Sequence, residues 1–191
     1  LKRVDLTSKT IITKIESGSC FVGFLAELVF AADRSFMAEG VFDGNNSHES
    51  SLLLTTANFG RHPMSNQLSR LGTRFLSDTS WEKTLKQNIG IDLKAEAADA
   101  LGLITAIYDE IDWEEEIRLF VEERISFSPD ALTGLEANTR FAGPETMETK
   151  IFGRLTAWQN WIFQRANAVG EAGALSRYGS RKKVNFDRKR V

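Results

Sequence analysis

The segment from Gly18 to Ser35 restricts the possible folds more than any other part of the sequence. It reads GSCFVGFLAELVFAADRS, in which two glycines precede a long apolar run that contains one charged residue, Glu27. A run that is apolar on all sides predicts a buried helix, which we expect over residues 24–32. An ionised carboxylate inside such a helix is costly unless a cation pairs with it or a proton neutralises it. Glu27 therefore needs an explanation of its own.

Two interpretations of Glu27 fit the sequence. Burial favours the protonated form of a carboxyl group, which would make Glu27 a proton donor or acceptor near neutral pH. The residues alone favour the other interpretation, a structural carboxylate at an exposed edge or in an ion pair with Arg34 or Lys14. The two glycines allow a similar choice, between a simple tight turn and a turn whose backbone amides stabilise an oxyanion.

The composition is that of an ordinary globular domain, alone or with an appendage. The 191 residues are 42% hydrophobic and 26% charged, with a formal net charge of −2. No window holds the roughly 18 apolar residues of a membrane span, and no leader of basic and then apolar residues opens the chain. The lone cysteine, Cys20, predicts a reducing compartment and hence a cytoplasmic location. A chain that starts at Leu1, without methionine, is consistent with part of a longer protein.

Hydrophobic periodicity and turn residues predict a small α/β half followed by a helical half. We expect strands over residues 10–15, 34–37, 51–55 and 103–107. We expect helices over residues 65–75, 94–102 and 112–125, and further helices that begin at a capping box near residue 79 and at prolines 129 and 144.

The last predicted helix carries an apolar stripe. Apolar residues recur in it at steps of three or four, at Met147, Ile151, Leu155, Trp158 and Ile162. Three aromatic residues widen the stripe: Phe152, Trp161 and Phe163. A helix this aromatic is expected to bury itself against its own domain or against a second subunit. The second possibility predicts a homo-oligomer, for which a dimer is the simplest form.

The charge is uneven along the chain. The segment 177–191 holds seven Lys or Arg and one Asp, a net charge of +6, so the rest carries −8 to give the total of −2. Such a tail predicts a contact with phosphate groups, with a solvated terminus or a nucleic-acid contact as alternatives. The acidic remainder argues against nucleic acid. The two histidines and single cysteine form no zinc pattern, so we expect no metal site.

Four segments, in the right order, resemble the crotonase (enoyl-CoA hydratase) superfamily. Residues 8–39 resemble its strand, glycine-rich turn and buried helix ending in Asp, and NFGRHPMSNQLSRLG (58–72) resembles the next segment, which ends in a helix with an arginine. Residues 97–117 resemble its Ala…Gly-Leu-Val segment, and GALSRYGSRKKVNF (173–186) resembles its basic ending. The resemblance implies an α/β fold, with a partial crotonase-like ββα core followed by an all-helical C-terminal region.

The expected division of the chain follows from this resemblance. Residues 1–110 would form a partial second crotonase-like repeat, and residues 111–191 a helical region with a basic tail. Residues 15–35, 123–171 and 186–191 further resemble the C-terminal part of a ring-cleaving branch of the superfamily, which degrades benzoate aerobically as CoA thioesters. The N-terminal remainder of such an enzyme is therefore an implied partner.

The resemblance implies a lyase that opens the 2,3-epoxide or dihydrodiol of benzoyl-CoA with water and releases formate. It implies no metal and no redox cofactor, because coenzyme A enters as part of the substrate. It implies neither a nucleic-acid nor a membrane partner. The alternatives are a degenerate, non-catalytic crotonase-like repeat that serves dimerisation and lid formation, and another hydratase or isomerase of the same superfamily.

The resemblance also implies functions for individual residues. Glu27 falls where active crotonases carry one of two catalytic glutamates, while Gly23 and Phe24 fall at the turn that supplies an oxyanion amide. Arg181, Lys182 and Lys183 match terminal cations that reach CoA phosphates in crotonases. Phe186 lies beside them, where it could stack on an adenine or anchor the tail.

Two departures from the family pattern affect this site. The usual three glycines are reduced to Gly23, because Phe24 and Leu25 follow it. The second catalytic glutamate is expected a few residues before Gly60, where the sequence has Thr-Thr-Ala-Asn instead. We therefore expect the site in this chain to be incomplete and the chemistry to belong to the part of the enzyme outside it.

Overall fold

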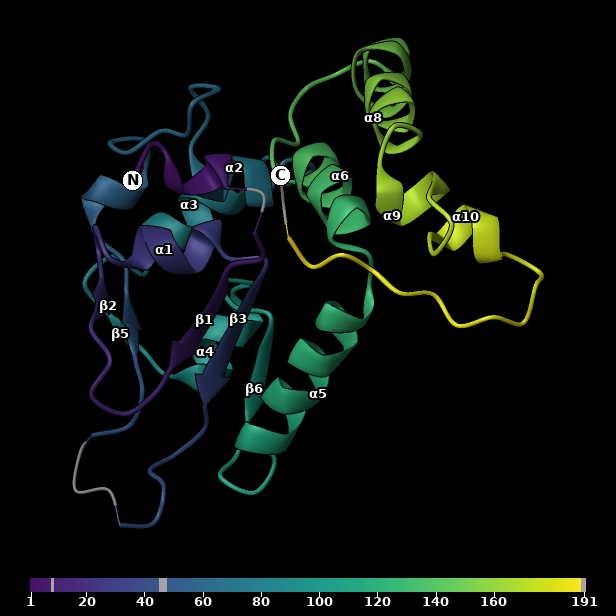
Figure 1. Ribbon diagram of the computed structural model, residues 1–191. Helices are drawn as coiled ribbons and strands as arrows, with labels where there is room; N and C mark the ends of the chain where they lie inside the picture. Colours follow the sequence, from purple (N-terminus) through teal and green to yellow (C-terminus); the bar gives the residue numbers. More distant parts are fainter. Residues whose placement is uncertain (8, 45–47, 190–191) are drawn as a thin grey trace. The chain divides into compact units, whose positions relative to one another are not determined.

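The computed structural model describes residues 1–7, 9–44 and 48–189, which form two compact units, Leu1–Leu119 and Phe120–Val191 (Figure 1). The last two residues of the basic tail, Arg190 and Val191, lie outside the described residues. Strands occur only in the first of these two units, within the described residues, and the second is helical. The predicted α/β class is confirmed.

The first unit alternates short strands and helices. Its strands are β1 (Ile12–Ile15), β2 (Phe21–Val22), β3 (Arg34–Ala38), β4 (Leu52–Leu53), β5 (Asp92–Leu93) and β6 (Ala106–Tyr108). Its α-helices are α1 (Ala26–Ala31), α2 (Arg70–Arg74), α3 (Trp81–Lys86) and α4 (Ala95–Ala100), with 3-10 turns at η1 (Val4–Leu6) and η2 (Thr56–Asn58). Helix α5 (Trp113–Ser126) begins in the first unit and runs into the second.

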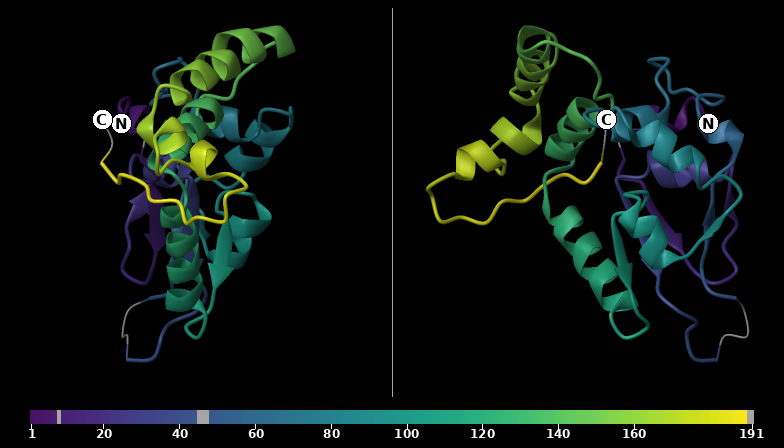
Figure 2. Two further views of the ribbon diagram at one scale, coloured as in Figure 1. Left: turned by 45° about the vertical axis from the view of Figure 1, so that its right-hand side comes forward. Right: turned by 180° about the vertical axis from the view of Figure 1, so that it is seen from behind.

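Two three-stranded sheets form the centre of the first unit. In one sheet β3 lies between β1 and β6 and is parallel to both, with Ile12 opposite Arg34. In the other, β4 lies between β2 and β5, parallel to β2 and antiparallel to β5. Parallel strands require a crossover connection, and α1 lies in the crossover from β1 to β3. Helix α4 lies behind the first sheet, as the reverse view in Figure 2 shows.

The core of the first unit lies around α1 and the two sheets. Helix α1 is buried almost all round, as its apolar sequence predicts, and it packs against α2. The fully buried members of the core are Ile15, Ala26, Val29, Met37, Leu52, Leu54, Leu71, Ala98 and Leu103. The charged side chain of Glu27 is carried into this core by the same helix and is 2% exposed.

The second unit is built from short helices. They are α6 (Pro129–Thr139), α7 (Met147–Thr149), the π-helix η3 (Lys150–Leu155), α8 (Thr156–Ile162), α9 (Ala166–Val169) and α10 (Ala174–Arg177). Helix α6 packs against α8 and α9. Beyond α10 the tail is extended and turns back, shown in yellow in Figure 1.

Several helices begin later than the sequence predicts. Helix α1 begins at Ala26, and Phe24 and Leu25 belong to the preceding turn. Helix α2 begins at Arg70, not at residue 65, because the Ser69 hydroxyl accepts a hydrogen bond from the Gly72 amide. The predicted start at Ser128 is confirmed, with that hydroxyl as N-cap and proline in the first turn.

Two further predictions of helix starts are wrong. The capping box expected near residue 79 is absent, since α3 begins at Trp81 and its N-cap, Ser80, makes no side-chain cap hydrogen bond. The helix expected to open at Pro144 begins instead at Met147, where the Thr146 hydroxyl accepts from the Thr149 amide. It then passes through π-helical turns, which the regular spacing of the stripe does not predict.

The apolar stripe of η3 and α8 is only partly buried by its own unit. Met147, Phe152 and Leu155 are 73%, 74% and 54% exposed. Trp158 and Trp161 are half-buried and form a T-shaped pair with 5.1 Å between ring centroids. The prediction that a second subunit covers the stripe stays a prediction.

Candidate functional site

The turn after β2 is shaped by Gly23. Its φ of +46° lies in the left-handed region, which side chains other than glycine seldom adopt. A Cβ added there would lie 2.7 Å from the Thr55 hydroxyl oxygen. The backbone of the turn therefore packs against Thr55 as closely as it can, and a glycine is required.

The two backbone amides of the predicted oxyanion turn differ in their partners. The Gly23 N–H donates to the Leu53 carbonyl, with 3.0 Å between N and O, and so continues the β2–β4 pairing. The Phe24 N–H makes no hydrogen bond with any described residue. The Phe24 side chain is 52% exposed and packs edge-on against the His62 ring, at 5.4 Å between centroids. One amide of the turn is thus free, beside an exposed aromatic ring.

Glu27 is buried and fully engaged by hydrogen-bond donors. Its Oε2 lies 2.9 Å from Nη1 of Arg70, and its Oε1 lies 2.8 Å from Nδ2 of Asn58. The sequence suggested Arg34 or Lys14 as a cationic partner, and the structure replaces both with Arg70. The ion pair and the amide donor thus occupy both oxygens of the Glu27 carboxylate.

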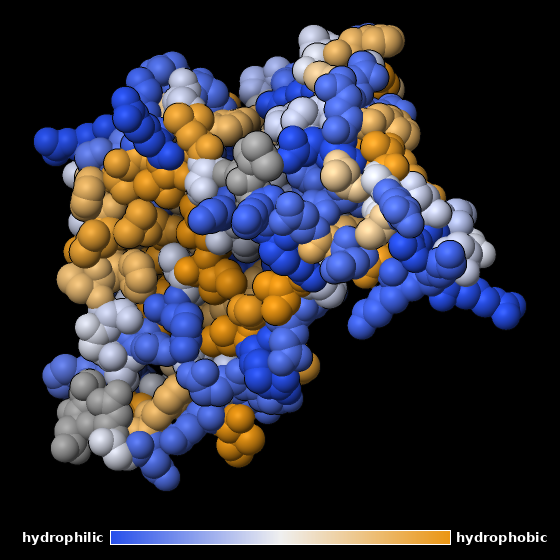
Figure 3. Space-filling view, viewed as in Figure 1, coloured by the Kyte–Doolittle hydropathy of each residue, from blue (hydrophilic) through white to orange (hydrophobic). Residues whose placement is uncertain are grey.

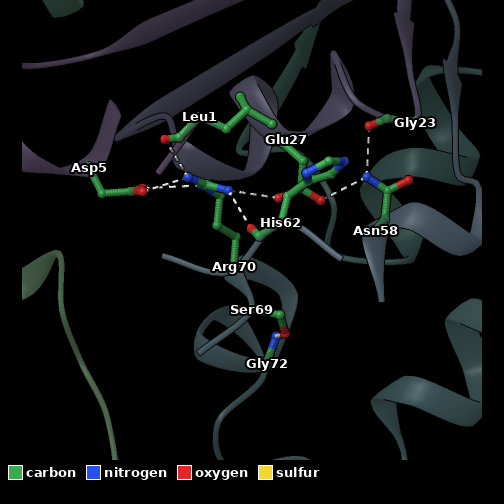
Figure 4. A network of polar contacts seen from close by, with 9 residues as sticks. All are labelled: Leu1, Asp5, Gly23, Glu27, Asn58, His62, Ser69, Arg70 and Gly72. Atoms are coloured by element: carbon green, nitrogen blue, oxygen red, sulfur yellow. Dashed lines mark hydrogen bonds and ion pairs between the residues drawn. The ribbon is translucent and has the colours of Figure 1, made fainter. Parts of the chain in front are cut away.

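Arg70 uses all five of its N–H donors in this cluster (Figure 4). Its Nε and Nη2 bind the carboxylate of Asp5, at 3.2 and 2.5 Å. The remaining donors bind Glu27 and the carbonyl oxygens of His62 and Leu1. One buried guanidinium thus ties the start of the chain, the loop before α2 and helix α1 together.

Asn58 lies where the sequence comparison with crotonases predicted a glutamate. Its Nδ2 donates to the Gly23 carbonyl and to Glu27, both at 2.8 Å, and its Oδ1 accepts from the Thr55 amide at 2.9 Å. The Asn58 side chain therefore holds the turn and Glu27 together. It brings an amide, not a second carboxylate, to Glu27.

Sequence reasoning missed three members of this cluster: Asp5, Asn58 and Arg70. A signal for Arg70 was present, since it is the arginine of the helix in residues 58–72 and stands among apolar residues. A buried arginine at 2% exposure requires carboxylate partners. Nothing in the local sequence pointed to Asp5, because it comes from a distant segment.

The predicted phosphate-binding residues lie in the second unit. Arg181, Lys182 and Lys183 are exposed, and Phe186 is half-buried, with the Arg188 guanidinium 5.9 Å from its ring centroid. Arg181 has a φ of +59°. These cations therefore lie on a turn of the tail that is open to solvent.

Beyond this turn several contacts hold the tail: the Asn185 amide donates to the Ala172 carbonyl at 3.2 Å, the Arg188 guanidinium donates to the Ile125 carbonyl, and Asn167 binds the Asp187 backbone. Asn167 donates from Nδ2 to the Asp187 carbonyl at 3.0 Å and accepts from the Asp187 amide at 2.7 Å. Its Nδ2 also donates to the buried Asp130 carboxylate, which Arg165 binds as well. We call the pair Asn167 and Asp187 the tail anchor. The residues between α10 and Asp187 are therefore held at both ends and do not form a free terminus.

Three surface cavities and the grouping of metal-binding side chains can be compared with the predicted site residues. Cavities of about 370, 260 and 340 Å³ occur on the surface, and none of these three is lined by Glu27, Gly23 or Phe24. Among residues 1–7, 9–44 and 48–189, no group of three or more His, Cys, Asp or Glu side chains could hold a metal ion. None of the helices formed by these residues has the length and apolar character needed to cross a membrane.

Comparison with known proteins confirms the resemblance seen in the sequence. The chain is 51% identical over all 191 residues to a protein of Aromatoleum evansii named benzoyl-CoA-dihydrodiol lyase. It spans 34% of that relative, about a third of its length. No family model matches the chain.

Solved structures show which fold the chain has. An enoyl-CoA hydratase from Geobacillus kaustophilus HTA426 superposes with a TM-score of 0.70 at 16% identity, covering 97% of this chain and 64% of that one. Enoyl-CoA hydratases from Bacillus anthracis and Mycobacterium paratuberculosis (the latter a hydratase/isomerase) give TM-scores of 0.66 and 0.69, at 16% and 13% identity. They cover 96% and 97% of this chain, and it covers 64% of each of them. The chain therefore has a crotonase-type fold, as predicted.

Proposed function

We propose that this chain is part of a CoA-thioester lyase that opens the 2,3-epoxide or dihydrodiol of benzoyl-CoA with water and releases formate. The observation that carries the proposal is 51% identity, sustained over the whole chain, to a protein named benzoyl-CoA-dihydrodiol lyase. Because the chain spans 34% of that relative, the activity is proposed for the longer protein that contains it. Its place would be in aromatic catabolism, at a step of benzoate degradation.

The proposed reaction needs no oxidant or reductant. The oxygen atoms of the formate and of the semialdehyde come from the epoxide or diol and from water, so the ring opening is hydrolytic. We therefore expect no redox cofactor. We also expect no metal, as the resemblance to crotonases implies, with coenzyme A present only as part of the substrate.

We propose that Glu27 supports structure and that the chemistry belongs to the part of the enzyme outside this chain. The buried ion pair with Arg70 and the amide of Asn58 support this division. A general acid or base needs a proton that it can exchange with substrate, whereas both oxygens of Glu27 are occupied by protein donors. The free amide of Phe24 is the one group of the turn that could still contact a thioester.

The second candidate function is that of a degenerate crotonase-like repeat that serves dimerisation and lid formation. It is favoured by the exposed apolar side chains of Met147, Phe152 and Leu155, which are unusual for a surface facing water. The two proposals are compatible within one enzyme. A homo-dimer would cover this stripe.

The exposed cations of the tail fit the proposed substrate. Coenzyme A carries phosphate groups, and Arg181, Lys182 and Lys183 present three positive charges on one turn. We propose that this turn binds those phosphates. We also propose a cytoplasmic location, which fits the free thiol of Cys20.

The test uses the full-length enzyme and the 2,3-epoxide of benzoyl-CoA, with formate measured by a coupled dehydrogenase. Formate release in proportion to substrate consumed is the expected result. Hydration of a linear enoyl-CoA without formate from the epoxide would instead support the superfamily's other reactions.

Glu27→Gln in the same enzyme tests whether Glu27 is structural and the catalytic residues lie outside this chain. We expect kcat to change by less than about tenfold, whereas loss of a general acid or base costs about 10²–10⁴-fold. A loss of that size in a variant with an unchanged unfolding midpoint would assign Glu27 to the chemistry.

A further inference from the structure

The second unit buries two polar side chains that hold the tail. Asp130 and Asn167 are 4% and 6% exposed, less than the buried leucine of the same unit, Leu132, at 8%. Both oxygens of Asp130 are used, since Oδ1 accepts from Arg165 at 3.1 Å and Oδ2 accepts from Asn167 at 2.9 Å. Buried polar groups are costly unless they are hydrogen-bonded, so such a cluster favours one arrangement of its members.

This cluster fixes the orientation of the Asn167 amide. A carboxylate paired with an arginine accepts hydrogen bonds and donates none, so Asp130 directs Nδ2 of Asn167 towards itself. The Oδ1 atom of Asn167 then accepts from the Asp187 amide at 2.7 Å, while Nδ2 also donates to the Asp187 carbonyl. The tail anchor thus depends on a buried carboxylate as well as on Asn167.

A second set of contacts shapes the turn that carries the cations. The Ser180 amide and hydroxyl both donate to the Arg177 carbonyl, at 3.0 and 2.7 Å, and the same hydroxyl accepts from the Lys182 amide. Arg181 lies between them with a left-handed backbone, which is unfavourable for a residue with a Cβ and persists where neighbouring contacts hold it. The turn therefore has a defined conformation, with α10 before it and the tail anchor after it.

The cations of this turn are without partners among the described residues. The side chains of Arg181, Lys182 and Lys183 form neither an ion pair nor a hydrogen bond there. Figure 3 shows hydrophilic residues, in blue, that project at the right of the view, where the tail turns back in Figure 1. Adjacent unpaired cations on a held turn are available to an external anion.

We propose that Asn167 and Ser180 are positioning residues for phosphate binding, which hold the turn 179–183 in the shape that receives the phosphates of coenzyme A. This inference rests on the proposed function in one respect, that this turn binds those phosphates. A flexible tail loses conformational freedom when it binds, and holding its backbone beforehand lowers that cost. Loss of either residue therefore weakens phosphate binding, although neither side chain contacts a phosphate.

A double-mutant cycle tests this proposal, with the dissociation constant of CoA measured by isothermal titration calorimetry on the full-length enzyme. We expect Lys182→Ala to raise this constant about fivefold in the otherwise unmodified enzyme, because one exposed cation is lost. In an Asn167→Ala or a Ser180→Ala background the same substitution should raise it by less than about twofold, because the turn no longer holds Lys182 at the phosphate. An undiminished effect of Lys182→Ala in both backgrounds would overturn the proposal.

Ser176→Ala is the matched control background. Ser176 is an exposed serine of α10, and its hydroxyl also donates to a backbone carbonyl, that of Val169. The full effect of Lys182→Ala should be retained there, and its loss would overturn the proposal by showing that the turn responds to any nearby change. Ser180 is exposed, so Ser180→Ala keeps the proposal testable even if Asn167→Ala prevents folding.

The positioning role and the lyase function can fail separately. Formate release together with a full Lys182→Ala effect in every background would refute the positioning role and leave the reaction standing. A Lys182→Ala effect that depends on Asn167 and Ser180, in an enzyme that releases no formate, would support the positioning role and refute the reaction. If Lys182→Ala alone leaves CoA binding unchanged, the turn does not bind phosphate and the positioning role is refuted with it.

Discussion

Arg70 holds Glu27 in a buried ion pair, with 2.9 Å between Nη1 and Oε2 and side chains that are 1% and 3% exposed. The same guanidinium binds Asp5 at 2.5 Å through Nη2. Two carboxylates and one cation thus share a buried site, and the cluster stays intact only while Arg70 is present. The carboxylate of Glu27 is tolerated inside the buried helix α1 because Arg70 pairs with it.

Removal of Arg70 is therefore expected to be far more harmful than removal of an exposed arginine. Arg70→Met leaves two buried carboxylates unpaired, and breaking a buried pair in this way costs about 3–5 kcal/mol. Arg118→Met is the control, because its bridge to Glu115 is on the surface and such bridges contribute about 1 kcal/mol or less. Urea unfolding of the full-length protein measures both. A similar loss for the two variants would contradict a structural role for the cluster.

Asn58→Asp should destabilise the protein in a pH-dependent way. The new carboxylate would face Glu27 and the Gly23 carbonyl, which now accept hydrogen bonds from Asn58 at 2.8 Å. Repulsion raises the folded-state pKa of the new group. Its penalty is therefore small at pH values below its unfolded pKa and grows as the pH rises. Unfolding midpoints at several pH values check this trend.

Asn58→Ala provides the comparison for that variant. It loses the same hydrogen bonds without adding a charge, so its destabilisation should change little with pH. If the two variants lose stability in parallel at every pH, the charge of the new carboxylate is not the cause.

The buried helix and the turn could be predicted from the sequence, whereas the partners of Glu27 could not. An all-round apolar run specifies burial of α1 by itself, and a glycine before it specifies a turn. The pairing of Arg70 with Glu27 and with Asp5 depends on contacts between residues 43 and 65 positions apart, and no local pattern encodes these. For the same reason, nothing local in the sequence marks Asn167 as the residue that anchors the tail.

Sequence patterns predicted local helix geometry only in part, as the helix starts and the apolar stripe show. The Ser128 cap was predictable because proline follows it directly, which fixes the first turn. The Thr79–Glu82 pattern suggested a capping box, but Ser80 hydrogen-bonds Asp78 instead and α3 begins one residue later. The regular three- or four-residue spacing of the stripe likewise did not predict the π-helical turns at 150–155.

Glu16 is expected to contribute stability that is lost in acid. Burial raises its pKa, but hydrogen bonds from Lys14 and Trp113 outweigh burial and hold the pKa below the ordinary 4.5. A carboxyl group with a lowered folded-state pKa stabilises the fold above its ordinary pKa, and the effect disappears as the pH falls through the lowered value. Because the Glu16 side chain is 45% exposed, Glu16→Gln should cost at most about 1 kcal/mol at neutral pH.

The control for Glu16 is Glu49→Gln, at an exposed glutamate of the same unit. The difference in unfolding free energy between the two variants should shrink towards zero as the pH falls below 4.5. A difference that is constant from pH 7 to pH 3 would show that the hydrogen-bonded charge is not its source.

Asn167→Ala should loosen the tail, although the hydrogen bonds of Asn185 and Arg188 remain. The substitution removes both hydrogen bonds to the Asp187 backbone and the one to the Asp130 carboxylate. Limited proteolysis with trypsin, followed by mass spectrometry, should then cut after Lys182 or Lys183 faster than in the unmodified protein. Asn160→Ala changes an exposed asparagine on α8 and should leave the cleavage rate as it was. Equal rates for the two variants would mean that the tail is held by other contacts.

Lys182→Ala and Lys183→Ala should weaken binding of the CoA thioester without slowing the chemistry. Each removes an exposed cation worth about 1 kcal/mol to a phosphate contact, so KM in the full-length enzyme should rise about fivefold while kcat stays nearly constant. The effect should fade at high salt, because exposed charges are screened. Lys83→Ala, at an exposed lysine on α3, should leave KM unchanged. A thioester of dephospho-CoA, which lacks one phosphate, should respond less to the tail substitutions. An equal response, or a fall in kcat with KM constant, would remove the tail turn from phosphate binding.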